Sequence, residues 1–353
     1  MSRLPLLSLF LLPALLAACT GTDEPQVALR VVLLTSGGTS LQAVTPNADS
    51  NPAPVSTNKV VPVTDGVIIN SLPSGRRLAL TVRTTGLESR NSNLEDIQGF
   101  NDPLTTPLCL VQTVSSAARD RLLTLSQCPN GPQQLALYAD TGQLIWTATL
   151  RTFVPPAPGP DVPPIRLAVR GDVAVVARPR VGGGSEVLRV AVKTSGDPVA
   201  EVSLSLPTPA IRDLVAYGSG ILAATDTGVQ QVADTGVPDG VALTAFGARR
   251  YDRLWSSAGG QNLVAAWRSN VLSNQNSQPL LVWDGAATRA ASTVAAFSDL
   301  RDLTLAPDGY LYSLTATTLT RYDYALGLQS GNFTPRVLLT GLNDARAVIW
   351  LVP

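Results

Sequence analysis

The chain has 353 residues with 26 basic and 26 acidic side chains, so its formal net charge is zero. This balance argues against binding to DNA or RNA, since both select a basic excess. Histidine is absent and the one methionine is Met1, which excludes imidazole metal ligands, Ser-His-Asp and Cys-His nucleophile pairs and histidine general bases. An enzyme built on this chain would need carboxylates, a lysine or tyrosine base, or an ion held by oxygen ligands.

Residues 1–18 have the pattern of a secretory signal peptide. Arg3 supplies a positive amino end, and the apolar run over residues 4–18 is too short to span a bilayer as a mature helix. The run ends in Leu16-Ala17-Ala18-Cys19, which resembles the lipobox of bacterial lipoproteins, whose cysteine receives a diacylglycerol. The alternative is an ordinary secretory signal with a chance cysteine.

The lipobox resemblance implies that the mature protein begins at a lipidated Cys19, joined by a short tether over residues 19–26 to the folded part. Thr20 stands where aspartate would mark retention in the inner membrane, so release to the outer membrane is implied. We therefore expect a cell-envelope protein on the extracytoplasmic side, anchored in the membrane by its N-terminal lipid. Its partner would be another envelope protein, with no nucleic acid involved.

The two remaining cysteines, Cys109 and Cys128, form an even pair, which an oxidising compartment would keep as a disulfide. Folding residues 108–128 about their polar centre places Gln112 opposite Leu125 and brings Cys109 opposite Cys128. The sequence therefore predicts a cross-strand bridge. The alternative is a pair of buried, unlinked thiols.

Beyond residue 26 no long segment has apolar residues at the helical period, whereas short Val-, Leu- and Thr-rich runs recur between turn residues. The pattern predicts a nearly all-β chain. Runs that begin with arginine recur every 41 to 48 residues, a period typical of a propeller or solenoid. These runs begin at Arg166, Arg212, Arg253, Arg301 and Arg346.

A second landmark keeps the same period, because each unit also carries a strand-like run ending in a polar turn. The best copy, residues 138–146, reads Tyr-Ala-Asp-Thr-Gly and then a strand ending in Trp146, and it resembles the repeats of quinoprotein-type β-propellers. Residues 306–312, Ala-Pro-Asp-Gly-Tyr-Leu-Tyr, resemble the hairpin of NHL and lactonase-like propellers. These resemblances imply a β-propeller.

The repeat length predicts the number of blades. Arg121, Arg77 and Arg30 continue the spacing backwards, so that Arg30 to Arg346 spans seven intervals. We predict an all-β fold in which residues 27–353 form a β-propeller of about seven four-stranded blades, closed by the C-terminal strand. In the predicted hairpin that joins the cysteines, however, Arg121 begins the second strand of a blade and not the first. The extension of the repeat to Arg121, Arg77 and Arg30 is therefore left open.

The alternative fold separates the N-terminal part. Residues 66–82 have the strand, Leu-Pro-Ser-Gly turn and strand of prealbumin-like sandwich modules. Residues 27–90 would then form a small β-sandwich and residues 100–353 a propeller of five or six blades, with the polar segment 91–107 as linker. In both readings the proline-rich segment 154–164 is a stiff loop between blades.

Acidic residues recur beside the repeat arginines. They would line one rim of the propeller channel and hold a hard cation such as Ca²⁺, or would tether neighbouring blades by hydrogen bonds and ion pairs. These candidate channel-rim or blade-tether residues are Asp213, Asp252, Asp302, Asp344, Arg212 and Arg301. No catalytic residue and no metal ligand is assigned.

Two classes of function follow. The first is a lipid-anchored binding or scaffold module, because a scaffold needs none of the catalytic side chains that the chain lacks. The second is a carboxylate- and Ca²⁺-dependent propeller enzyme, lactonase-like or glycan-active, or a small-ligand sensor. Four or more acidic or amide side chains converging on the channel floor would favour the second class, whereas an apolar or Arg-Asp paired channel would favour the first.

Overall fold

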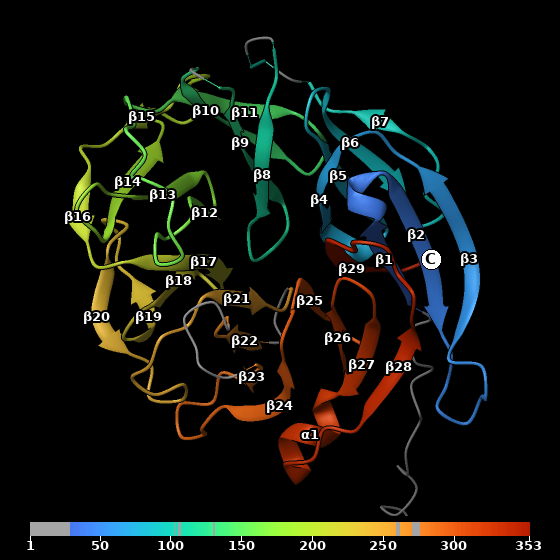
Figure 1. Cartoon of the computed structure of the whole chain (residues 1–353). Helices are drawn as coiled ribbons and strands as arrows, with labels where there is room; N and C mark the ends of the chain where they lie inside the picture. The colour runs from blue at the N-terminus through green and yellow to red at the C-terminus, as the bar shows by residue number, and fades with distance from the viewer. Residues whose placement is uncertain (1–28, 102, 105–106, 130, 259–261, 270–275) are drawn as a thin grey trace, which may run out of the picture.

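A computed structural model describes residues 29–353, apart from residues 102, 105–106, 130, 259–261 and 270–275. The strands form seven antiparallel sheets arranged as blades around a central channel, so the fold is a seven-bladed β-propeller (Figure 1). This confirms the predicted fold class. The predicted signal peptide, Cys19 and the whole of the tether over residues 19–26 lie outside the described residues.

Within six of the blades the strands follow the chain outward from the channel, and each pairs with the next. Blade 1 contains β4 (Gly66–Ser71), β5 (Arg77–Val82), β6 (Gly86–Asn91) and β7 (Gln98–Gly99). Blade 2 contains β8 (Leu110–Ser115), β9 (Arg121–Gln127), β10 (Gln133–Ala139) and β11 (Leu144–Thr149). Blade 3 contains β12 (Arg166–Arg170), β13 (Val173–Pro179) and β14 (Ser185–Ala191), with the outer position shared by β15 (Glu201–Val202) and β16 (Leu206–Thr208).

The chain continues in the same order. Blade 4 contains β17 (Ile211–Tyr217), β18 (Gly220–Thr225), β19 (Gly228–Val232) and β20 (Pro238–Ala242). Blade 5 contains β21 (Arg253–Ser256), β22 (Val264–Trp267), β23 (Gln278–Trp283) and β24 (Ser292–Phe297). Blade 6 contains β25 (Asp302–Leu305), β26 (Tyr310–Leu314), β27 (Leu319–Asp323) and β28 (Pro335–Leu339), with the short helix α1 (Tyr324–Ser330) after β27.

Blade 7 joins the two ends of the sequence. Its inner strand is β29 (Ala347–Leu351), which pairs with β1 (Arg30–Thr35), followed by β2 (Ser40–Pro46) and β3 (Val55–Pro62). Because β29 fills the inner position, β1 has a partner on both sides and the ring closes as predicted. The segments that the alternative assigned to a separate sandwich form blade 7 and blade 1, and the supposed linker carries β7.

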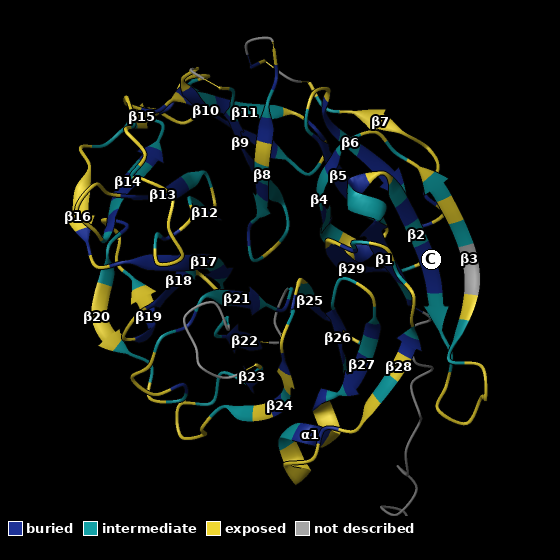
Figure 2. Cartoon of the chain, in the orientation of Figure 1, coloured by how far each residue is buried: buried dark blue, intermediate teal, exposed yellow. Residues whose placement is uncertain are grey.

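The hydrophobic core is divided among the seven contacts between neighbouring blades. Seven clusters of buried residues each combine side chains from two adjacent blades. A middle strand is covered on both faces, which explains continuous apolar runs such as Val31–Leu34 in β1. Figure 2 shows the consequence: strands near the channel are largely buried, whereas the outer strands β7, β16 and β20 are exposed.

The inner strands all run in the same direction through the ring. We call the end at which they begin, beside Arg166 and Asp302, the upper mouth of the channel, and the end at which they finish, beside Ser71, the lower mouth. Arg166 and Arg253 begin inner strands as the repeat predicted. The extension of the repeat towards the N-terminus is wrong. Its three arginines begin the second strand of a blade, next to the inner strand, and therefore lie at the lower end of the ring. These arginines are Arg30 in β1, Arg77 in β5 and Arg121 in β9.

The predicted disulfide between Cys109 and Cys128 is confirmed, with their Cα atoms 5.0 Å apart. It fastens the upper end of the β8–β9 hairpin, in which Gln112 lies opposite Leu125 as expected. In the part of the chain that the structure describes, no helix has the length and hydrophobicity needed to cross a membrane.

Candidate functional site

The seven inner strands enclose a cavity of about 220 Å³, and each of them contributes to its wall. Its lining includes three guanidinium groups and two carboxyl groups. Among the described lining residues these charged groups belong to Arg119, Arg166, Arg253, Asp213 and Asp302. The channel wall therefore brings together charged side chains from several blades.

Asp213 joins three blades at the upper mouth. One carboxylate oxygen lies 3.1 Å from Arg166 Nε, and the other lies 3.5 Å from Arg253 Nε. The second oxygen also accepts a hydrogen bond of 2.9 Å from the backbone N–H of Leu254 in β21. The side chain is mostly buried, so these partners compensate a charge that would otherwise be costly.

Asp302 makes an equivalent link two blades further on. It begins β25 in blade 6 and accepts hydrogen bonds of 2.8 Å from Trp255 Nε1 in blade 5 and from the N–H of Val348 in blade 7. Burial raises the pKa of Asp302, although the charge of Arg253 and these hydrogen bonds oppose that effect. Like Asp213, Asp302 accepts hydrogen bonds from donors on neighbouring blades.

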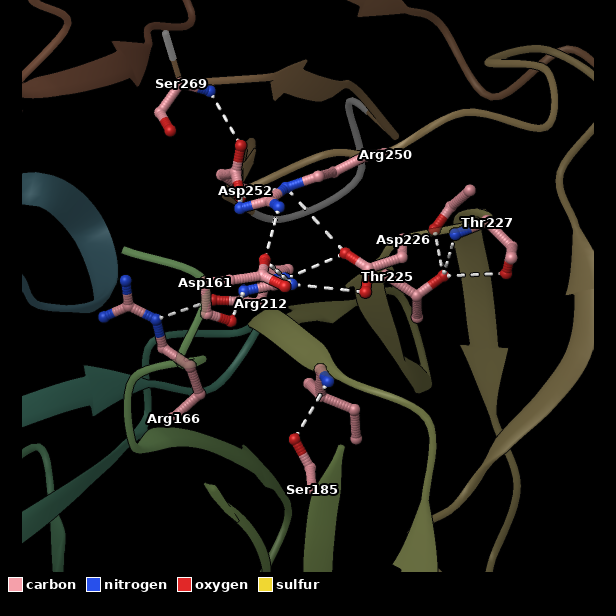
Figure 3. Close-up of polar contacts among 12 residues, drawn as sticks. Asp161, Arg166, Ser185, Arg212, Thr225, Asp226, Thr227, Arg250, Asp252 and Ser269 are labelled. Atoms are coloured by element: carbon pink, nitrogen blue, oxygen red, sulfur yellow. Dashed lines mark hydrogen bonds and ion pairs between the residues drawn. The ribbon is translucent and has the colours of Figure 1, made fainter. Parts of the chain in front are cut away.

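A second network covers the upper mouth (Figure 3). Asp161, from the proline-rich segment between blades 2 and 3, lies between two arginines, 2.7 Å from Arg212 and 2.8 Å from Arg250. Asp226 also pairs with Arg212, at 2.9 Å. Although burial acts to raise the pKa of Asp161, the hydrogen bonds and charges of the two arginines lower it below its ordinary value. The proline-rich loop is therefore fastened to blade 4.

The other predicted rim residues lie in separate ion pairs. Asp252 pairs with Arg250 at 2.7 Å and accepts a hydrogen bond of 2.8 Å from the N–H of Ser269. Asp344 lies 3.8 Å from Arg301, outside the cavity lining. The structure thus brings Asp213 and Asp302 to the channel wall, places Asp252 beside the mouth and leaves Asp344 apart.

The predicted carboxylates do not converge on a shared point. Within the described residues, no group of three or more His, Cys, Asp or Glu side chains is placed to hold a metal ion. Each of Asp213, Asp252 and Asp302 instead accepts hydrogen bonds from its own protein donors. Among the described lining residues, Asp213 forms the kind of Arg-Asp pair that we expected for a binding or scaffold module.

The lower mouth has a different composition, which the sequence did not indicate. Arg119 lies in the turn between β8 and β9 with φ of 62°, and its guanidinium carbon is 5.2 Å from the centre of the Trp350 ring. No described carboxylate pairs with it. Burial lowers the pKa of Arg119 to about 10, so the group remains charged at neutral pH. Nothing in the Ala-Ala-Arg-Asp turn marks this arginine as a channel residue.

Comparisons with known proteins identify the fold. No family model and no curated protein matches the chain. Two solved structures provisionally named 6-phosphogluconolactonases are similar to it. The Bacteroides fragilis protein has a TM-score of 0.61 at 11% identity, covering 94% of this chain and 100% of its own. The Bacteroides uniformis protein has a TM-score of 0.62 at 14% identity, covering 92% of this chain and 100% of its own.

A third structure supports the same conclusion. The β-propeller domain of Cps50 (Swd1) from Myceliophteria thermophila has a TM-score of 0.54 at 12% identity, covering 81% of this chain and 90% of its own. Such low identities show a common fold, and propellers carry many unrelated functions. The chain is thus a seven-bladed β-propeller whose fold is similar to that of these three structures.

Proposed function

We propose that this chain is a lipid-anchored protein of the bacterial cell envelope whose propeller is a binding module for another envelope protein. The observation that carries the proposal is the pairing of Asp213 and Asp302 with donors on neighbouring blades. Carboxylates used in this way hold the ring together. A Ca²⁺-dependent enzyme would need six to eight oxygen ligands converging on one point.

The proposed location rests on the sequence and on one structural feature. Leu16-Ala17-Ala18-Cys19 resembles a lipobox, and Thr20 in place of aspartate favours the outer membrane over the inner one. The disulfide between Cys109 and Cys128 suits an oxidising extracytoplasmic compartment.

Replacing Cys19 with serine tests the anchor. The Cys19→Ser protein should leave the membrane fraction and lose its lipid, whereas its thermal unfolding should match that of the wild type, because Cys19 precedes the propeller. Continued membrane association of the variant would contradict lipid anchoring.

The outer faces of blades 3 and 4 are where we place the contact with the partner. Leu204 and Val241 are 70% and 68% exposed, on or beside the outer strands of two neighbouring blades, and exposed apolar side chains of this kind mark protein contacts when they gather. Cross-linking in intact envelopes followed by purification should identify a protein that Leu204→Glu and Val241→Glu release. The control Ile97→Glu, on the outside of blade 1, should retain that protein.

A lactonase-like enzyme is the second candidate, supported by the fold shared with the two Bacteroides structures. Arg166 and Arg253 at the channel wall would suit an anionic lactone, and Asp302 is the buried carboxyl group beside them. Hydrolysis of 6-phosphogluconolactone by the purified chain, lost in Asp302→Asn and kept in Asp344→Asn, would select this candidate over the binding module.

A further inference from the structure

Three hydrogen-bond donors at the lower mouth have no acceptor among the residues that the structure describes. Ser71 is 2% exposed, and its Oγ makes no hydrogen bond with the described residues. The neighbouring Asn70 Nδ2 is also buried and unpartnered. Arg119 adds a guanidinium group that makes no ion pair within the described part of the chain. Buried polar groups are nearly always satisfied in native proteins, so the two buried orphans at Asn70 and Ser71, in the same cavity wall as an arginine without a described ion-pair partner, require an explanation.

The fold places these donors at the same end of the channel. Asn70 and Ser71 finish β4, and Arg119 follows β8, the next inner strand in the ring. Both segments line the same cavity. Trp350 contacts both segments. The Arg119 guanidinium lies over its ring. The ring also packs on Gly75, in the turn after β4, so closely that a Cβ on Gly75 would lie 2.4 Å from a ring carbon.

The charge of the channel is unbalanced at this end. At the upper mouth Asp213 lies between Arg166 and Arg253 and compensates them. Asp302, the second carboxyl group of the lining, accepts its hydrogen bonds from Trp255 and Val348 at that same end. Arg119 is left with the face of an aromatic ring, which compensates a buried cation only in part. No described carboxylate supplies the missing counter-charge at this end of the channel.

We propose that the lower mouth of the channel is a binding site for the oxyanion group of a small molecule, a carboxylate or a phosphate. The Arg119 guanidinium would donate two parallel hydrogen bonds to it, which is the geometry that arginine offers to planar and tetrahedral oxyanions. Ser71 Oγ would donate to a remaining oxygen lone pair, while Asn70 Nδ2 lies on the opposite face of the end of β4, because consecutive side chains of a strand alternate. The rest of the ligand would occupy the cavity between Arg119 and the upper mouth.

This site is separate from the protein-binding proposal, because it lies inside the ring and away from the outer faces of blades 3 and 4. It also uses none of the carboxylates that tether the blades. An empty oxyanion site would leave the membrane anchor and the partner contact unchanged, so the two proposals can fail independently.

Thermal unfolding and isothermal titration calorimetry of the full chain test the site. The probes are inorganic phosphate and acetate, each compared with chloride at the same ionic strength. We expect at least one of them to bind and raise the melting temperature, phosphate indicating a phosphate ester as ligand and acetate a carboxylate. Arg119→Gln should weaken that binding about tenfold or more. Arg76→Gln, an exposed arginine in the turn after β4, is the matched control and should bind like the wild type.

The ligand-free stabilities separate binding from a packing role. Without anion, Arg119→Gln should melt at or above the wild-type temperature, since it removes a partly desolvated positive charge that makes no ion pair with the described residues. Ser71→Ala is a second variant that keeps the charge and should weaken binding several-fold with little effect on ligand-free stability. Binding of neither probe, or equal binding by Arg119→Gln, Ser71→Ala and the wild type, would overturn the proposal. A ligand-free Arg119→Gln protein that melts well below the wild type would overturn it as well, because Arg119 would then serve packing.

Discussion

The two mouths of the channel are built from the same inner strands but differ in whether their charged and polar side chains have partners. At the upper mouth, carboxylates such as Asp161 and Asp213 each lie between two arginines taken from different blades or loops. At the lower mouth, Arg119 and Ser71 are donors without acceptors. Paired charge joins blades and needs no ligand, whereas unpaired donors remain available to one. The difference assigns stability to the upper mouth and recognition to the lower.

Removing β29 should have the largest effect, because this strand contributes to both mouths. Val348 donates to Asp302 at the upper mouth, and Trp350 lies against Arg119 at the lower mouth. Deleting residues 343–353 would also leave β1 and the inner edge of blade 7 unpaired. We expect the whole ring to lose its cooperative thermal transition, measured by calorimetry and circular dichroism.

Limited proteolysis of the same deletion variant distinguishes a closed ring from independent parts. A closed ring predicts cleavage throughout the chain. A stable N-terminal fragment ending near residue 90 would contradict it and restore the sandwich alternative.

The Asp213→Ala substitution should have the next largest effect and act on the upper mouth. It removes the acceptor of Leu254 N–H and leaves two arginines, Arg166 and Arg253, without their shared carboxylate. Breaking a buried ion pair from one side costs about 3–5 kcal/mol of unfolding free energy. Asp344→Ala, which removes a half-exposed carboxylate, should cost about 1 kcal/mol or less in the same urea unfolding experiment. Equal losses in the two variants would show that the upper mouth is not a special point of stability.

The disulfide gives a somewhat smaller effect and separates the two ends of one hairpin. Cys109 and Cys128 link the upper end of β8 and β9, whereas Arg119 lies in the turn at their lower end. In the chain-entropy model a loop of this length contributes about 3 kcal/mol. Cys109→Ser combined with Cys128→Ser should lower the free energy of unfolding measured with urea by that amount but leave phosphate or acetate binding intact. Loss of anion binding in the double variant would show that the two ends are coupled.

The pH dependence of stability should give the smallest effect. In the folded state, Arg212 and Arg250 lower the pKa of Asp161 below 3.8. The ion pairs of Asp161 therefore contribute to the free energy of unfolding above pH 3.8. That contribution is lost as the pH falls through the folded-state pKa. Because Asp161 is largely exposed, the contribution is under about 1 kcal/mol. Below about pH 4, the free energy of unfolding measured with urea should therefore depend less on pH in Asp161→Asn than in the wild type.

Asp302 should change the pH dependence of the unfolding free energy in the opposite direction. Burial raises its folded-state pKa above 3.8, so Asp302 stabilises the fold below pH 3.8. That contribution disappears as the pH rises through the raised pKa. If Asp161→Asn and Asp302→Asn change the pH profile in the same direction, the contrast between these two carboxyl groups is wrong.

The strand pairing of the fold was predictable where the sequence carried a local turn or a long repeat. The β8–β9 register followed from the two cysteines, and closure by β29 followed from the repeat length. The backward register failed at Arg77 and Arg121 because second strands, like inner strands, are buried on both faces. An arginine followed by an apolar run therefore fits either position.

The site was less predictable than the fold. Asp213 and Asp302 share one repeat position, so their placement at the channel could be anticipated. Asp161 reaches Arg250 across 89 positions of sequence from a loop without periodicity, and Arg119 projects from an ordinary turn. Contacts of this kind depend on how the ring closes in three dimensions, and no local pattern encodes them.

The most direct test of the contrast between the mouths is a crystal structure of the full chain grown with the anion that binds in calorimetry. Our account predicts that the anion lies within hydrogen-bond distance of the Arg119 guanidinium and Ser71 Oγ, with Asp213 still between Arg166 and Arg253. An anion bound instead at Arg166 or Arg253, with Asp213 displaced, would contradict the assignment of stability to the upper mouth and recognition to the lower.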